Sequence, residues 1–304
     1  MPPVDDHDAP TIPPAPPGQH RHAPSSHDYG TRRGGHTPTE PGLVDPAWTR
    51  LAFAGIVPVL LAISAALPTW TRLILMVLLV PAAAQGWPAL VRARHDALST
   101  AVVTLTGTAA AVTVALLGDF GAAGVVMAAS VLASFVAQML RRDGREDLVE
   151  DLSATMTGNL IVVSGAGWCA LAPNIADPAI LVPCSLALFT GALLTTLEVR
   201  ATILEVLTTT VSPLVSGVAG GLLAAIGFFG PAHTGAVPAM QSAAACLVVG
   251  FVAGILMASA NRVLWTHRWV PGGRAAVASA VVPILAVGAP VYAIARLMGS
   301  FISG

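Results

Sequence analysis

The chain has 304 residues, of which 55% are apolar and only 10% charged, and its formal net charge is -1. A soluble domain carries about a quarter charged residues, so a mean hydropathy of +0.74 indicates a membrane protein. A nearly neutral chain without a basic patch gives no reason to expect nucleic-acid binding. All fifteen basic residues are arginine, and this lysine-free composition is typical of a GC-rich bacterial genome.

The first 50 residues differ from the rest in composition. They hold eleven prolines and five histidines, and their apolar content is too low to build a core. We expect a disordered cytoplasmic tail over residues 1–50 and a transmembrane helical domain over residues 51–304. Four spaced histidines in the tail are more simply interpreted as solvated than as a metal site: His20, His22, His27 and His36. No metal site and no cofactor are expected.

Nine apolar segments follow the tail. They are long, rich in Ala, Leu and Gly, and do not alternate apolar with polar residues, so they predict helices rather than barrel strands. The predicted segments are 51–67, 71–90, 98–117, 120–140, 152–172, 178–197, 206–229, 238–261 and 275–298. The expected fold is an all-α polytopic membrane protein with about nine transmembrane helices.

The arginines lie almost entirely in alternate connections between these segments. One set of connections holds Arg50, Arg92, Arg94, Arg141, Arg142, Arg145, Arg200, Arg262, Arg268 and Arg274, and the opposite set holds only Arg72 and Arg296. Cytoplasmic loops carry the excess of basic residues. We therefore predict a cytoplasmic N-terminus and an outer C-terminus, in the inner (plasma) membrane of the cell.

Small residues predict where helices approach closely. The pairs Gly217/Gly221 and Gly250/Gly254 each place two glycines on one helical face, although glycine is also simply common in this chain. The three cysteines all fall in apolar segments, and their odd number favours packing over a disulfide.

Prolines and isolated polar residues inside the segments predict local interruptions. Pro213, Pro283 and Pro290 should kink their helices and free backbone groups, which often border cavities. Asn159 and Ser212 need partners inside the membrane; they either line a pathway or join neighbouring helices.

Acidic residues gather at the predicted cytoplasmic edge. Asp147 and Asp151 are four residues apart and share a helical face, which admits a divalent ion. The plainer interpretation is a helix N-terminus, where the macrodipole favours acids. Glu198 and Glu205 lie near Arg200 and are expected to pair locally.

A third, basic group contains Arg262, His267, Arg268 and Arg274. Anionic lipid headgroups attract such a cluster at the cytoplasmic face, although every topology-setting loop looks similar.

Three short segments resemble the bacterial phosphatidate cytidylyltransferases (CDP-diacylglycerol synthases). Residues 152–155 (Leu-Ser-Ala-Thr) open the fifth segment after a charged loop, and residues 211–220 are similar to the family's S-P-K-K-[ST]-x-E-G. Residues 271–273 (Pro-Gly-Gly) are similar to the P-G-H-G-G that precedes the family's D-R-x-D. A polar tail and about nine spans in about 300 residues also match. The resemblance implies a membrane scaffold for lipid chemistry.

The chain departs from that family where the chemistry resides. Leu214 and Val215 stand where the family has two lysines, residues 278–281 (Ala-Ser-Ala-Val) replace D-R-x-D, and Thr195 and Thr196 lie where an acid is expected. Cytidylyl transfer needs carboxylates to hold divalent metals and cations to hold the triphosphate. The resemblance therefore implies a relative that kept the scaffold and lost the reaction.

Three kinds of function follow. We favour a non-catalytic membrane protein that binds a lipid, a membrane protein partner or a second copy of itself. A permease or lipid translocator is the alternative, and an active lipid enzyme using Asp147, Asp151, Glu198 and Glu205 is the third. No catalytic residue is assigned. The expected lipid-headgroup ligands are Arg200, Arg262, Arg268 and Arg274, with Asn159, Ser212 and Ser216 lining a groove between the fifth, seventh and ninth segments.

Overall fold

The computed structural model describes residues 43–44, 47–93, 97–140, 148–171, 180–197, 199–229, 235–264 and 270–302. The helices are α1 (Ala47–Ser64), α2 (Thr69–Leu90), α3 (Ala97–Leu117), α4 (Gly121–Leu140), α5 (Leu148–Gly165), α6 (Gly167–Ala170), α7 (Leu181–Leu194), α8 (Ala201–Ala225), α9 (Ala236–Leu264) and α10 (Gly272–Ile302). Two short strands, β1 (Leu43–Val44) and β2 (Val270–Pro271), complete the described fold. The prediction of helices rather than barrel strands is confirmed.

Each predicted apolar segment overlaps a helix, and the fifth is divided between α5 and the short α6. Within the described residues, 6 helices are long and apolar enough to cross a membrane: α2, α3, α4, α8, and most of α9 and α10. α1 and α7 contain shorter apolar stretches, Leu51–Ser64 and Leu181–Leu194. A membrane protein is therefore supported, while the count of nine spans and their orientation remain predictions.

Most of the predicted tail lies outside the described residues, which begin at Leu43. β1 pairs antiparallel with β2, with Leu43 opposite Pro271 and Val44 opposite Val270. α1 then begins at Ala47 instead of the expected residue 51. The strand pairing holds the start of α1 beside the start of α10.

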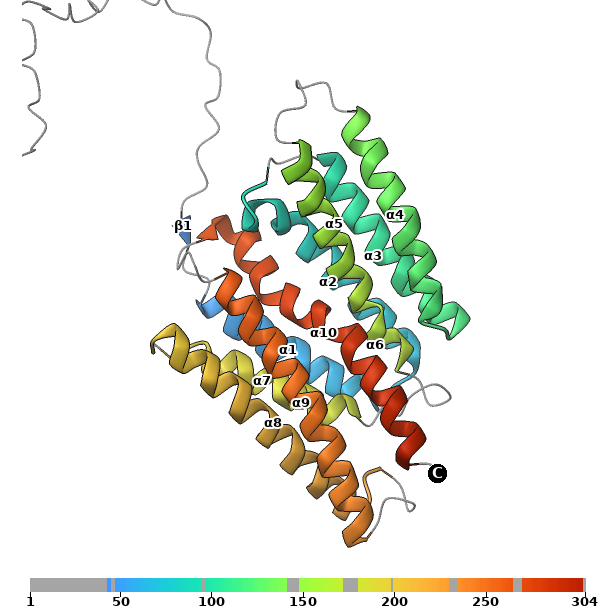
Figure 1. Ribbon diagram of the computed structural model, residues 1–304, viewed down its shortest axis with the longest axis vertical. Helices are drawn as coiled ribbons and strands as arrows, with labels where there is room; N and C mark the ends of the chain where they lie inside the picture. Colours follow the sequence, from blue (N-terminus) through green and yellow to red (C-terminus); the bar gives the residue numbers. More distant parts are fainter. Residues whose placement is uncertain are drawn as a thin grey trace, which may run out of the picture. The chain divides into compact units, whose positions relative to one another are not determined.

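α10 joins two groups of helices (Figure 1). In the first group α2, α3, α4 and α5 pack against one another, and in the second α1, α7, α8 and α9 do so. α10 packs against α2 and α5 of the first group and against α1 and α9 of the second. Its side chains Val281, Ile284, Leu285 and Val291 are fully buried, so much of the shared core lies along this helix.

α8 and α9 approach each other closely through glycines. A Cβ atom on Gly250 would lie 2.5 Å from Ser216 Cβ and 2.9 Å from Pro213 Cα, and one on Gly254 would lie 2.9 Å from the Thr208 carbonyl oxygen. Real Cβ atoms do not fit at these distances, so only glycine permits the observed separation. The prediction that these glycines mark a close helix contact is confirmed.

The proline at position 290 interrupts the backbone bonding of α10. Proline has no N–H to give the carbonyl four residues earlier, which here belongs to Ala286. The Ser164 hydroxyl of α5 donates to that carbonyl at 2.8 Å and accepts from the backbone N–H of Ala289 at 3.1 Å. The freed group is therefore satisfied by a neighbouring helix rather than by a cavity.

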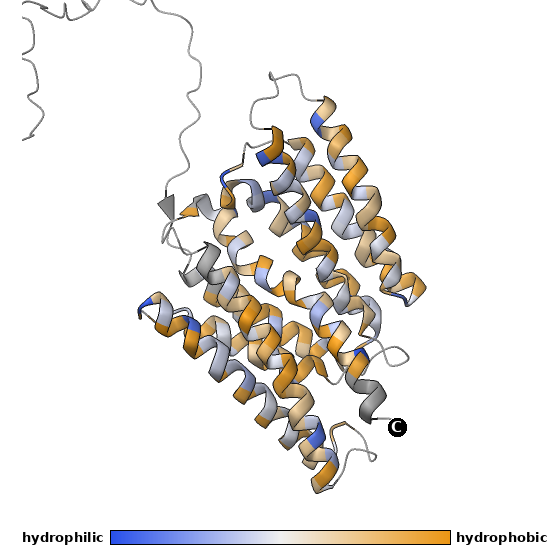
Figure 2. Ribbon diagram, in the orientation of Figure 1, coloured by the Kyte–Doolittle hydropathy of each residue, from blue (hydrophilic) through white to orange (hydrophobic). Residues whose placement is uncertain are grey.

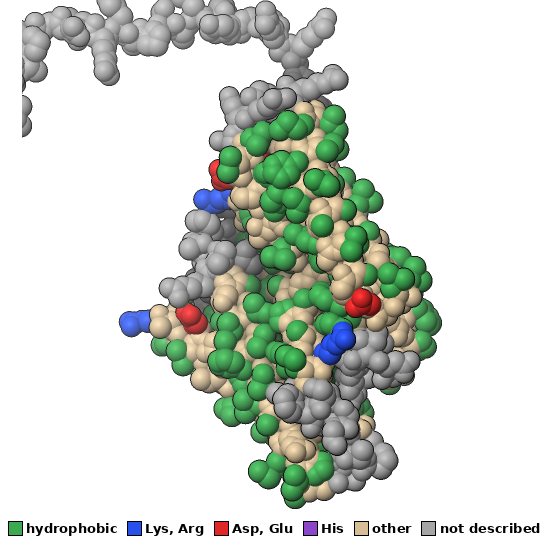
Figure 3. Space-filling model, turned by 45° about the vertical axis from the view of Figure 1, so that its right-hand side comes forward, with side chains coloured by type: hydrophobic (Ala, Val, Ile, Leu, Met, Phe, Trp, Pro, Cys, Tyr) green, Lys and Arg blue, Asp and Glu red, His purple; other side chains and the backbone are tan. Residues whose placement is uncertain are grey.

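Apolar side chains cover the flanks of the bundle (Figure 2). Leu105, Leu116 and Val125 are among the large side chains that are mostly exposed. On the face seen in Figure 3, apolar side chains cover most of the described surface, and only a few charged ones are present among them. Soluble monomers rarely expose apolar patches beyond a few hundred Å², so this surface is suited to lipid.

Candidate functional site

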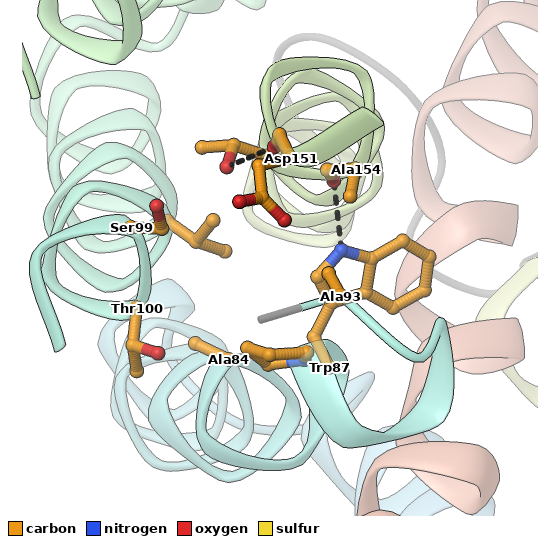
Figure 4. A pocket seen from close by; sticks show the side chains of 10 residues that line it. Ala84, Trp87, Ala93, Ser99, Thr100, Asp151 and Ala154 are labelled. Atoms are coloured by element: carbon orange, nitrogen blue, oxygen red, sulfur yellow. Dashed lines mark hydrogen bonds between the residues drawn. The ribbon is translucent and has the colours of Figure 1, made fainter. Parts of the chain in front are cut away.

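A pocket lies where the arginine-bearing connections meet the helices. The end of α2 and the beginnings of α3 and α5 surround it (Figure 4). Trp87 fixes one wall, because its indole N–H donates to the Ala154 carbonyl of α5 at 2.8 Å. We call this space the Asp151 pocket; its lining includes Ala84, Trp87, Ser99, Thr100, Asp151 and Thr155.

Asp151 is the only buried acid among the residues that the structure describes, with 5% of its surface exposed. It lies in the first turn of α5, where the helix macrodipole favours a carboxylate. Its own carbonyl accepts a bond from Thr155 Oγ1 at 2.8 Å. Figure 4 shows the carboxylate pointing away from α5 toward Ser99 of α3. The interpretation of this acid as part of a helix N-terminus is confirmed.

The Asp151 pocket is small. Its interior amounts to about 10 Å³, which is room for about one water molecule. A second space of about 10 Å³ lies between Trp87, Val103, Gly158 and Val282, and it shares Trp87 and Val103 with the first. Neither space holds a nucleotide or a lipid headgroup in this conformation.

Polar side chains form a buried seam among α3, α4 and α5. On α4 and α5 they recur every fourth residue and so share one face of each helix. We call this set the polar seam; it comprises Ser99, Ser130, Ser134, Gln138, Asp151, Thr155 and Asn159, all of them buried. Gln138 Nε2 donates to Ser99 Oγ at 3.4 Å, which joins α4 to α3.

Asn159 is fully buried in this seam. Its amide Nδ2 donates to Ser134 Oγ at 3.0 Å, and that hydroxyl donates in turn to the Ser130 carbonyl. The Asn159 Oδ1 atom has no hydrogen-bond partner among the described residues. Exchanging the amide oxygen and nitrogen does not help, because the Ser134 proton is already used. One amide atom is left for a water or another donor.

Two of the four arginines predicted to bind lipid headgroups have side chains that the structure describes. Arg200 immediately precedes α8 and Arg274 lies in the first turn of α10, and both side chains are exposed. The Arg262 side chain and the whole of Arg268 lie outside the described residues. The backbone of Arg274 is fixed, because its carbonyl packs directly on Gly86 of α2. Arg274 therefore lies at the same end of the bundle as the Asp151 pocket.

The three predicted groove-lining residues are buried but lie in different parts of the bundle. Asn159 lies between α5 and α4, whereas Ser216 donates to the Cys246 carbonyl of α9 at 2.8 Å. Ser212 also faces α9, where its Cβ and carbonyl lie against Gly254 and Gly250. Because α8 packs mainly on α9 and α7, these serines join helices, and the structure does not bring them together with Asn159.

The described acidic residues that the enzyme hypothesis requires also lie in different helix groups. Asp151 belongs to α5 of the first helix group and Glu205 to α8 of the second, while Asp147 and Glu198 lie outside the described residues. In the described part of the chain, no group of three or more His, Cys, Asp or Glu side chains is placed to hold a metal ion.

Sequence reasoning missed Trp87, Ser99 and Gln138. The spacing of Ser130, Ser134 and Gln138 was a usable signal, because a polar residue at every fourth position of an apolar helix predicts a polar face. Trp87 gave no such signal, since tryptophan is common at membrane interfaces.

Comparison with known proteins adds no relative. No family model matches the chain, and neither a curated protein nor a solved structure does.

Proposed function

We propose that this chain is a non-catalytic, multi-pass inner-membrane protein that binds anionic lipid at its arginine-bearing helix ends. It has nine spans, with the N-terminus in the cytoplasm and the C-terminus outside. Its scaffold is that of a degenerate phosphatidate cytidylyltransferase relative, and its partners are membrane lipids together with a membrane protein or a second copy of the chain.

The observation that carries this proposal is the exposure of Arg200 and Arg274 at the ends of apolar helices. Exposed arginines at that position lie at the depth of lipid headgroups, and each attracts an anionic membrane surface by about 1 kcal/mol. Arg274 belongs to the predicted basic group that also contains Arg268. The flanks below these helix ends are apolar, as lipid contact requires.

Two observations support a protein without cytidylyltransferase activity. Leu214 and Val215 stand where the resembled family has two lysines. The chain therefore lacks the positive charges that would bind the triphosphate of CTP at these positions. The Asp151 pocket has a volume of about 10 Å³, far less than a nucleotide occupies.

The test is lipid retention by the purified protein. In the Arg268→Ala/Arg274→Ala double variant we expect several-fold less co-purifying anionic phospholipid, measured by mass spectrometry in mild detergent, with an unchanged melting temperature. Arg296→Ala is the matched control, because that exposed arginine lies at the opposite end of α10. Equal lipid retention in all three proteins contradicts the proposal.

The same preparations distinguish the other candidates. Turnover of CTP by the wild-type protein, lost in Asp151→Asn, would assign an enzyme. A stoichiometric protein that co-purifies would assign an assembly or regulatory subunit.

A permease or translocator is the second candidate, and the polar seam favours it. Its seven buried polar side chains extend from the arginine-bearing end of the bundle into the interior. Asn159 Oδ1 has no hydrogen-bond donor among the described residues. Uptake or exchange of a polar solute by proteoliposomes, reduced several-fold by Asn159→Leu, is the result that this candidate requires.

A further inference from the structure

Arg72 is an arginine buried inside the helix bundle. Only 1% of its surface is exposed, and among the fully buried residues it is one of the largest. It lies in the first turn of α2, one of the helices long and apolar enough to cross a membrane. Its Nε and Nη1 atoms have no hydrogen-bond partner among the described residues.

Burying the Arg72 guanidinium costs free energy unless an anion lies beside it. The guanidinium stays protonated in proteins, and a buried charge without a partner costs several kcal/mol. Ionisable residues in membrane spans are rare and mark binding or transport sites by default. The position therefore calls for a counter-charge.

The described acids of the chain do not supply a negative partner for the Arg72 guanidinium. Cys169 of α6 is close enough to interact with it electrostatically, and α6 packs against α2, α3 and α10. Of the described acids, Asp119 is engaged with the backbone N–H of Gly121. Asp151 lies beside Trp87 near the other end of α2, about 22 Å away along a helix that rises about 1.5 Å per residue.

We propose that Arg72 anchors a buried site for a small oxyanion, a phosphate or carboxylate group, between α2 and α6. A planar guanidinium matches two oxygens of either group with paired N–H donors. The site does not rest on the lipid-binding proposal, because it lies at the opposite end of α2 from the Asp151 pocket. The oxyanion belongs either to a lipid headgroup or to a soluble ion.

The experiment measures the melting temperature of the delipidated, full-length protein in detergent. The buffer contains chloride as its only anion at constant ionic strength, and inorganic phosphate, acetate or short-chain phosphatidylglycerol is then added. For the wild type we expect a saturable rise of about 5 °C at a large excess over the Kd. A response to phosphatidylglycerol alone identifies a lipid phosphate, and a response to phosphate or acetate identifies a soluble ion.

The Arg72→Met variant should melt at a higher temperature than the wild type in chloride, because it removes an unpaired buried charge, and it should not respond to any of the three anions. Arg72→Lys retains the charge without the fork and should respond more weakly, which keeps the test informative if Arg72→Met does not fold. Arg296→Met is the control and should respond like the wild type.

Two results would overturn the site. One is an anion response that survives in Arg72→Met, or that is absent from the wild type. The other is a lower melting temperature for Arg72→Met than for the wild type in chloride, which would show that the guanidinium already has a stabilising partner within the chain.

Discussion

The Ser164 hydroxyl donates to the Ala286 carbonyl at 2.8 Å, the group that loses its helical donor to Pro290. The same oxygen accepts from the Ala289 N–H at 3.1 Å. One side chain of α5 therefore satisfies both sides of the interruption in α10. The polar contact also fixes the register between these two helices.

Ser164→Ala should destabilise the protein by about 1–2 kcal/mol, because it leaves the part-buried Ala286 carbonyl without a donor. Reversible unfolding in mixed detergent measures the change. Ser153→Ala on the same helix is the control, since the exposed Ser153 hydroxyl donates within α5, to the Glu150 carbonyl. Equal effects of the two substitutions would show that the contact with α10 contributes nothing to stability.

Gly250→Ala should force α8 and α9 apart. The new Cβ would lie 2.5 Å from Ser216 Cβ and 2.9 Å from the Pro213 backbone, and overpacking of this kind costs about 1–3 kcal/mol. Thermal unfolding is the measurement. Gly124→Ala on α4 is the matched control, because nothing lies within 4 Å of the added methyl group, and it should be neutral or slightly stabilising. An unchanged melting temperature for Gly250→Ala would contradict the close contact.

Trp87→Phe should retain most of the apolar packing but lose the indole bond to the Ala154 carbonyl. We expect a loss of about 1 kcal/mol in the free energy of unfolding and faster hydrogen exchange at the beginning of α5. Trp70→Phe is the control, since Trp70 on the same helix is 59% exposed. If both variants unfold alike, Trp87 does not hold α2 to α5.

The predicted orientation can be tested by thiol labelling. The native cysteines are free and buried, so we expect a membrane-impermeant maleimide to leave the folded wild type unlabelled. Leu67→Cys should be labelled on intact cells, and Val199→Cys only after permeabilisation. Both positions are exposed, Leu67 at 45% and Val199 at 36%. The reverse pattern would invert the topology.

Helix positions could be predicted from the sequence because apolar runs of about 20 residues have few alternatives in a membrane. Gly250 and Gly254 also predicted that a neighbouring helix approaches this face closely, although not which helix it is. In both cases the physical cause acts within one short segment.

Partners across the bundle could not be predicted in the same way. Asn159 and Ser212 both needed buried partners, and the periodicity of each helix gave the face but not the neighbouring helix. They were therefore placed in one groove, although the structure puts them on opposite sides of α10. Arg72 was assigned to a connection because it begins a helix, and only the packing of α6 shows that it is buried.

α10 follows the other helices in the chain, yet it connects their two groups and is the most buried candidate span, at 67%. Chains emerge from the ribosome N-terminus first. The helices α1 to α9 are therefore synthesised before α10, the helix that packs against both groups. β1 likewise has no pairing strand until β2 is synthesised. Biogenesis should therefore end in one late, cooperative step, and chains stopped before α10 should be preferred substrates of membrane quality-control proteases.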